Sequence, residues 1–130
     1  MTRRSINVEG FSHGNLPIPA ASRVGPLVMT GGIHGIDVAS GKAGDVDDQA
    51  ARMFANLAKI LKGAGGGFES VVRLTVFVKV PEARAAVNNE WLKAFPDENS
   101  RPARHTLVND HLPAGMLMQC DATAYMTEAK

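Results

Sequence analysis

The sequence has little cysteine, few aromatic residues and no long hydrophobic run. Cys120 is the single cysteine, which excludes an internal disulfide and a thiolate-rich zinc site and suits a reducing compartment. The basic start of the chain is not followed by an apolar stretch, and no window approaches the roughly 18 consecutive apolar residues of a membrane-spanning helix. We therefore expect a cytoplasmic protein with no membrane partner.

An excess of charge of either sign is also lacking. The chain has 14 lysines and arginines against 13 aspartates and glutamates, for a formal net charge of +1. Such a balance creates no strong field toward nucleic acid, so we expect no nucleic-acid partner. A small-molecule ligand fits this composition better.

The length of the chain and its glycine and proline positions indicate one domain over residues 1–130. The sequence contains no repeat and no low-complexity tract. Gly25-Pro26 separates two short runs within residues 20–31, which predicts a hairpin. Residues 45–62 carry apolar side chains at i, i+3, i+4 spacing, with acidic residues at the start and Gly63 after the end. This pattern predicts a helix with one buried face.

The second half of the chain predicts one more helix among three strands. Residues 72–80 alternate with period two, so we expect a strand with one apolar face. Pro81 begins a helix that we expect to end near residue 95, and strands are expected over 105–109 and 116–125. The order β-ββ-α-β-α-ββ predicts an α+β fold, in which two helices pack on one face of a single mixed sheet.

The other face of this sheet has no second layer to cover it. Phe77, Leu117 and Tyr125 are expected there among polar residues. Apolar side chains on such a face indicate a subunit interface, and hence a homo-oligomer.

Four segments of the sequence form a recognisable set: VGPLVMTGG (24–32), FANLAKILKGAG (54–65), VVRLTVFV (71–78) and RPARHTLV (101–108). Together they resemble the YjgF/RidA reactive-intermediate deaminase family. They occur in the family's order and approximate spacing, so the resemblance covers nearly the whole chain. It implies a chorismate-mutase-like subunit in a homotrimer, with three sites between neighbouring subunits.

The family's activity is the hydrolysis of enamines and imines such as 2-aminoacrylate to 2-keto acids and ammonia, without a metal or organic cofactor. The resemblance implies that Arg104 binds the substrate carboxylate through two hydrogen bonds and that the backbone N–H of Gly32 donates to the same carboxylate. It also implies that the backbone carbonyl of Thr106 accepts from the imine nitrogen, so the Thr106 side chain should matter little. A guanidinium is suited to this task because it is planar, permanently charged and bidentate. The alternative for Arg104 is a solvated strand flank, and Arg101 is interpreted as a loop charge.

Two positions depart from the family. Gln119 stands where hydrolytic members carry a glutamate that handles the attacking water. An amide cannot be a general base, and the loss of such a base costs about 10²- to 10⁴-fold in rate. Asp121, on the same strand face, is a candidate replacement carboxylate. Ile18 stands where the family commonly has a tyrosine, which predicts a more apolar pocket wall and a longer aliphatic substrate.

The histidines lack the spacing of zinc ligands and have no suitably placed acidic residues beside them, so we expect no bound metal. His34, two residues after Gly32, is a candidate participant near neutral pH, the alternative being a polar surface residue. His105 should point to the face opposite Arg104, and Cys120 into the core.

Two functions remain open at this point. One is a RidA-like hydrolase of 2-enamine and 2-imine carboxylates. The other is a non-catalytic trimer that binds a small carboxylate or regulates, because Gln119 replaces the glutamate. The ribonuclease activity attributed to some relatives gains no support, because the chain has no basic, aromatic-interleaved patch.

Overall fold

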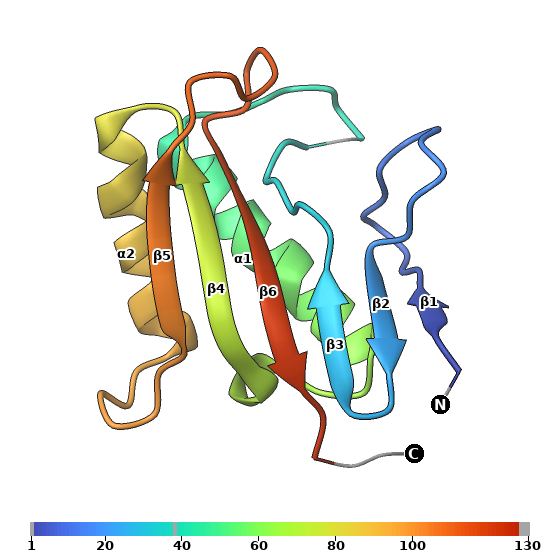
Figure 1. Cartoon of the computed structure of the whole chain (residues 1–130). Helices are drawn as coiled ribbons and strands as arrows, with labels where there is room; N and C mark the ends of the chain where they lie inside the picture. The colour runs from blue at the N-terminus through green and yellow to red at the C-terminus, as the bar shows by residue number, and fades with distance from the viewer. Residues whose placement is uncertain (1, 38, 128–130) are drawn as a thin grey trace.

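The computed structural model describes residues 2–37 and 39–127, which form one six-stranded sheet with both helices on one face (Figure 1). The strand order is β1-β2-β3-β6-β4-β5. This architecture confirms the α+β fold and the predicted order of elements. The elements are β1 (Arg4–Ile6), β2 (Ala21–Val24), β3 (Leu27–Thr30), α1 (Val46–Gly63), a short 3-10 helix (Phe68–Ser70), β4 (Val71–Val78), α2 (Pro81–Ala94), β5 (Ala103–Val108) and β6 (Met118–Tyr125).

The predicted hairpin is formed by β2 and β3. The two strands pair antiparallel, with Val24 opposite Leu27 at the turn. Gly25 has a φ of +57°, a left-handed conformation that glycine adopts without a steric penalty. Gly25-Pro26 therefore closes the hairpin, as the sequence indicated.

Helix α1 begins where the acidic cluster predicts. Asp45 is its N-cap, and the side chains of Asp45 and Asp48 each accept a hydrogen bond from the other's backbone N–H. The apolar stripe of the helix then lies fully buried against the sheet, as the spacing predicts. Its fully buried apolar side chains include Met53, Leu57, Ile60 and Leu61.

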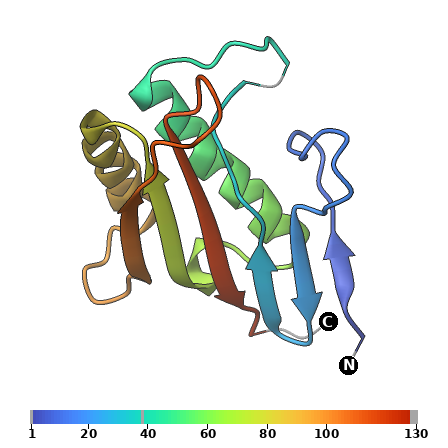
Figure 2. The same cartoon turned by 45° about the horizontal axis from the view of Figure 1, so that its top comes forward.

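Helix α2 lies beside the edge strand β5, on the same side of the sheet as α1 (Figure 2). Its buried side chains, Ala83, Ala86 and Val87, are small. The helix therefore packs closely while its other faces stay accessible at the edge of the sheet.

The register of β4 decides which way the site residues point. Leu74 and Val76 are fully buried beneath the helices. In the parallel β4-β5 pair, Arg104 is the partner of Leu74 and Thr106 the partner of Val76. Because paired residues point to the same face, Arg104 and Thr106 face the helix side. His105 pairs with Thr75 and faces the open side, as predicted.

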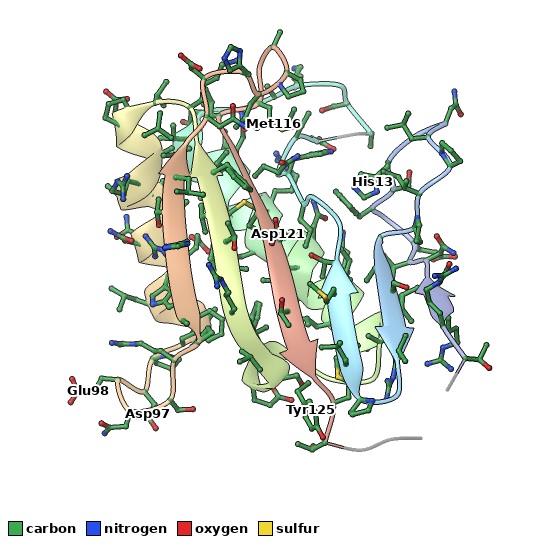
Figure 3. All side chains as sticks on the ribbon, in the orientation of Figure 1. His13, Asp97, Glu98, Met116, Asp121 and Tyr125 are labelled. Atoms are coloured by element: carbon green, nitrogen blue, oxygen red, sulfur yellow. The ribbon has the colours of Figure 1, made fainter. Side chains whose placement is uncertain are left out.

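The open face carries several exposed apolar side chains. Leu27 and Tyr125 are paired across β3 and β6, and Met29 and Leu107 are exposed on the same face. In Figure 3 the labelled Asp121 lies on this face, midway along β6.

Three strands differ in their bounds from the sequence prediction. Strand β4 covers Val71–Val78, one residue earlier at its start and two residues shorter at its end than the predicted 72–80. Strand β5 begins at Ala103, so that Arg104 lies within it rather than before it. Strand β6 begins at Met118, because the N–H of Leu117 donates to the side chain of Gln49 instead of a strand partner. Within the described ranges, no helix is both long and apolar enough to cross a membrane.

Candidate functional site

A free backbone N–H lies just beyond the end of β3. Gly31 donates its N–H to the carbonyl of Ala20, and Ile33 donates its N–H to the carbonyl of Cys120. Between them, the N–H of Gly32 has no acceptor in the described part of the chain. It is therefore available to a ligand.

Gln119 packs against this glycine. A Cβ at position 32 would lie 2.8 Å from the amide carbon and nitrogen of Gln119, so a side chain at this position would displace the Gln119 amide. The amide nitrogen of Gln119 lies 3.9 Å from Met116 Sδ, a weak contact. The carbonyl oxygen of Gln119 has no donor among the described residues, which leaves it able to accept from a water.

His13 is a neighbour of Gly32 that sequence reasoning missed. It belongs to the segment that connects β1 to β2, and Figure 3 places it beyond the end of β3. Its Nε2 lies 2.8 Å from the Gly32 carbonyl. Because a carbonyl only accepts, Nε2–H donates, and the buried Nδ1 is left without a partner within the described residues. His13 thus fixes the peptide that follows the free N–H.

Arg104 is held by three contacts on the helix side of β5. Its Nε donates to Thr106 Oγ1 at 2.8 Å, and one terminal nitrogen donates to Asn88 Oδ1 at 2.6 Å. The guanidinium carbon lies 5.1 Å from the ring centroid of Trp91. No acid pairs with Arg104 in the described part of the chain. The guanidinium group is oriented, but no acidic side chain among the described residues neutralises its charge.

Two of these contacts change the interpretation of the neighbouring residues. The Thr106 side chain, for which the resemblance implied no role, accepts a hydrogen bond from Arg104 Nε through its hydroxyl. Asn88 and Trp91, on α2, had no assigned contact from sequence, and both orient Arg104. Burial, with a smaller effect of the nearby Arg84 charge, lowers the pKa of Arg104.

The candidate residues fall into two groups on opposite faces of the sheet. Arg104 and Thr106 face α2, whereas Gln119 pairs with Phe77 on the open face beside Gly32. Strand β4 separates β5 from β6, which is about 10 Å across two strand spacings. A single chain does not bring both groups into one cavity.

Asp121 lies on the open face of β6, two residues from Gln119. It pairs with Thr75, the residue that also pairs with His105 in β5. Burial raises the pKa of Asp121, and the Arg73 charge acts in the opposite direction. Arg73 in turn contacts His105 Nδ1 at 2.8 Å. Asp121 thus belongs to a polar row that continues from Gln119 along the sheet.

His34 is positioned as a hydrogen-bond donor. Its Nδ1 accepts from the N–H of Ile36 at 3.1 Å, so the proton of the neutral ring is on Nε2. Burial, with a smaller effect of His13, lowers the pKa of His34, which favours that neutral ring. Ile18 is half exposed on the segment before β2. It lies two residues before Ala20, whose carbonyl accepts the hydrogen bond from the N–H of Gly31.

The described residues contain no group of three or more histidine, cysteine or acidic side chains arranged to hold a metal ion. Burial, with a smaller effect of the Asp121 charge, raises the pKa of the Cys120 thiol, which lies in the core as expected.

Sequence comparison finds relatives over most of the chain. The family model described as Endoribonuclease L-PSP matches residues 17–126. A RutC family protein from Pyrococcus abyssi is 32% identical over 111 residues, which are 84% of this chain and 86% of that protein. A protein from Capra hircus named 2-iminobutanoate/2-iminopropanoate deaminase is 33% identical over 126 residues, 95% of this chain and 90% of its own.

Solved structures share the fold. The solution structure of a hypothetical protein from Haemophilus influenzae has a TM-score of 0.85 at 30% identity, and covers 98% of this chain and 100% of its own. The crystal structure of the YjgF gene product from E. coli has a TM-score of 0.83 at 27% identity, and covers 94% of this chain and 98% of its own. With the matched family model, these likenesses show that the chain belongs to the YjgF/RidA family.

Proposed function

We propose that the protein is a RidA-like hydrolase that converts 2-enamine and 2-imine carboxylates to 2-keto acids and ammonia. The observation that carries this proposal is the oriented guanidinium of Arg104, which three contacts hold without an acid to neutralise it. Such a fork is complementary to a carboxylate. The deaminase names of relatives such as the Capra hircus protein support the reaction class.

In the proposed mechanism, Arg104 and the free N–H of Gly32 bind the substrate carboxylate. This places the C=N carbon near the Gln119 carbonyl, which accepts a hydrogen bond from water and orients it. The water oxygen adds to that carbon while a proton passes to the imine nitrogen. Collapse of the resulting carbinolamine breaks the C–N bond, and releases ammonia and the 2-keto acid.

The number of protons gained and lost in this reaction explains how an amide can replace the usual carboxylate. The attacking water must lose a proton, and the imine nitrogen gains one, so no net acceptor is consumed. We propose that Asp121, whose pKa is raised by burial, relays protons along the polar row that it shares with Gln119. The reaction is then slower than with a glutamate, but it does not require one.

We propose that the working form is a homotrimer in which neighbouring chains complete each site. Two observations support this assembly. Arg104 and the Gly32–Gln119 pair lie on opposite faces of one chain, so a site with both needs a second chain. The open sheet face also exposes Leu27, Met29 and Tyr125, which a partner subunit would cover.

The alternative function is a non-catalytic trimer of the same family, which binds a small carboxylate or regulates. The observation in its favour is Gln119 itself, since no ionisable group forms a hydrogen bond with its side chain among the described residues. Both functions predict carboxylate binding at Arg104. Only turnover separates them.

The deciding experiment generates imines in situ from several amino acids with an amino-acid oxidase, in the presence of semicarbazide as a competing trap. A hydrolase diverts the imine to keto acid and reduces semicarbazone formation. Arg104→Ala should abolish the diversion. Arg101→Ala is the matched control, because the Arg101 side chain donates to the backbone carbonyls of Phe95 and Pro96, just after α2, and not to Asn88. Binding of 2-oxobutanoate without any diversion would establish the alternative.

Shared sites are tested by mixing two inactive variants. Arg104→Ala chains retain Gly32 and Gln119. Gly32→Ala chains retain Arg104 and the N–H at position 32, but the added Cβ should displace the water-handling amide of Gln119. If a site combines residues of neighbouring chains, co-refolded mixtures regain activity that neither variant has alone. Mixed oligomers that form but stay inactive would show that each chain builds its own site.

A further inference from the structure

A second guanidinium lies near Arg104 on the accessible side of α2. Arg84 and Asn88 are four residues apart on this helix, so they share a stripe, one turn apart. Asn88 binds Arg104 through its Oδ1. Arg84 thus lies about 6 Å further along the helix axis from the anchor of the first fork.

The charge of Arg84 is also uncompensated. It makes no ion pair in the described part of the chain. Glu82, two residues away, projects from a different side of the helix, and Glu90 pairs with Lys93 at 3.0 Å. The repulsion from Arg84 contributes, after burial, to the lowered pKa of Arg104. Two unneutralised cations near one another favour an anionic ligand that contacts both.

A pocket of about 290 Å³ adjoins Arg84 at the end of β5. Its wall combines an aliphatic surface with positive charge, which suits a short methylene chain ending in an acid. The Lys79 ammonium, which also lines it, donates to the carbonyl of Leu112 at 2.9 Å and has no acid partner within the described residues. The lining residues are Val78, Lys79, Val80, Pro81, Arg84 and Val108.

We infer that the site extends along α2 to Arg84 and takes 2-imino dicarboxylates in preference to monocarboxylates. Arg104 binds the carboxylate next to the imine, the aliphatic wall contacts the methylene groups, and Arg84 binds the distal carboxylate. This substrate class rests on the proposed function. Arg84 then determines specificity and does not take part in the hydrolysis.

The first test measures binding, which needs no turnover. Calorimetry compares 2-oxoglutarate with 2-oxopentanoate, a keto acid of the same chain length without the distal carboxylate. The wild-type protein should bind 2-oxoglutarate about tenfold or more tightly, as expected for a charge-assisted contact. Arg84→Gln should remove that preference, and Arg84→Lys should keep part of it. Equal affinities in the wild-type protein, or a preference that persists in Arg84→Gln, would overturn the inference.

The second test measures turnover of the imines generated from glutamate and from norvaline. The ratio of their kcat/KM values should fall about tenfold or more in Arg84→Gln. Lys93→Gln removes a different cation from the exposed surface of α2, at a position that adjoins α1, and should leave the ratio unchanged. If neither imine is diverted to keto acid but the protein still prefers 2-oxoglutarate in the binding test, the proposed hydrolase activity is refuted and the proposed dicarboxylate site is supported. Diversion of both with equal efficiency would refute the dicarboxylate site alone.

A structural role of Arg84 gives a different result. If Arg84 pairs with an acid of a neighbouring chain, Arg84→Gln weakens the oligomer and leaves the 2-oxoglutarate preference in place. Light scattering on the same samples detects that change, and this outcome also overturns the inference. Glutamine is a good helix former, so the variant is expected to fold.

Discussion

Thr106→Val tests whether the guanidinium of Arg104 must be held in place to bind a carboxylate. Valine keeps the branched shape of threonine but removes the hydroxyl that accepts from Arg104 Nε at 2.8 Å. A hydrogen bond to a charged group contributes about 1.5–3 kcal/mol. Because Arg104 is only half-buried, we take about 1 kcal/mol after discounting for solvent screening.

That free energy corresponds to about fivefold weaker carboxylate binding. The loss is partial because Asn88 Oδ1 and the Trp91 ring still hold the guanidinium. If the carboxylate is bound equally in the ground state and the transition state, KM rises about fivefold while kcat changes little. The Kd of 2-oxobutanoate, measured by calorimetry, should rise by the same factor.

Thr75→Val is the matched control for this substitution. Thr75 is a half-buried threonine in the neighbouring strand β4, and its side chain faces the open side, away from Arg104. Equal effects of Thr106→Val and Thr75→Val on KM and Kd would refute the orienting role of the hydroxyl. A fall in kcat at constant KM would place Thr106 in the chemical step instead. Asn88→Ala combined with Thr106→Val should show coupling, since both residues hold one guanidinium.

Three further predictions follow from the same geometry. Gln119→Glu restores a carboxylate beside Gly32 and should raise kcat for imine hydrolysis by up to about 10²-fold; unchanged steady-state rates would argue against water handling at this position. Burial raises the pKa of Asp121 above its ordinary 3.8, so the folded chain holds this proton more tightly than the unfolded chain, and the site loses stability as the pH rises through the folded-state pKa. Asp121→Asn should therefore raise the Tm at pH 7 more than at pH 3, and equal shifts at both pH values would contradict the burial effect. The buried thiol of Cys120, with its raised pKa, should resist iodoacetamide in the native protein and react after unfolding, as mass spectrometry would detect; rapid native labelling would show that the core opens.

Local patterns were sufficient to predict most elements of the fold. Helix α1 was predicted because apolar spacing, acidic N-terminal residues and Gly63 agree on one segment. The hairpin was predicted because Gly25-Pro26 marks its turn. The start of β5 was placed two residues late, since Ala103 carries no apolar alternation that would distinguish a strand from the preceding loop.

The contacts of the candidate site were less predictable than its residue types. Sequence reasoning selected Arg104 for its guanidinium, but the partners that orient it depend on the packing of α2 against β5. Asn88 lies sixteen residues away and Trp91 belongs to the same helix, so no local pattern links them to the arginine. His13 reaches Gly32 across nineteen residues for the same reason. Such contacts arise from tertiary structure, which periodicity does not encode.

The position of Arg104 in an edge strand has a consequence for both proposals. A guanidinium in a central strand would have strands of its own chain on both sides, which would keep the edge of a neighbouring chain further away from it. Among residues 2–37 and 39–127, β5 has β4 on one side and no strand on the other, while α2 provides Asn88, Trp91 and Arg84 along its length. A neighbouring chain can therefore bring its own Gly32 and Gln119 to this edge without disturbing the contacts that orient Arg104. The open edge beside β5 also leaves room for the ligand to extend along α2. In the two proposals together, the neighbouring chain provides the water-handling Gln119, and Arg84 on α2 selects the substrate by binding its distal carboxylate.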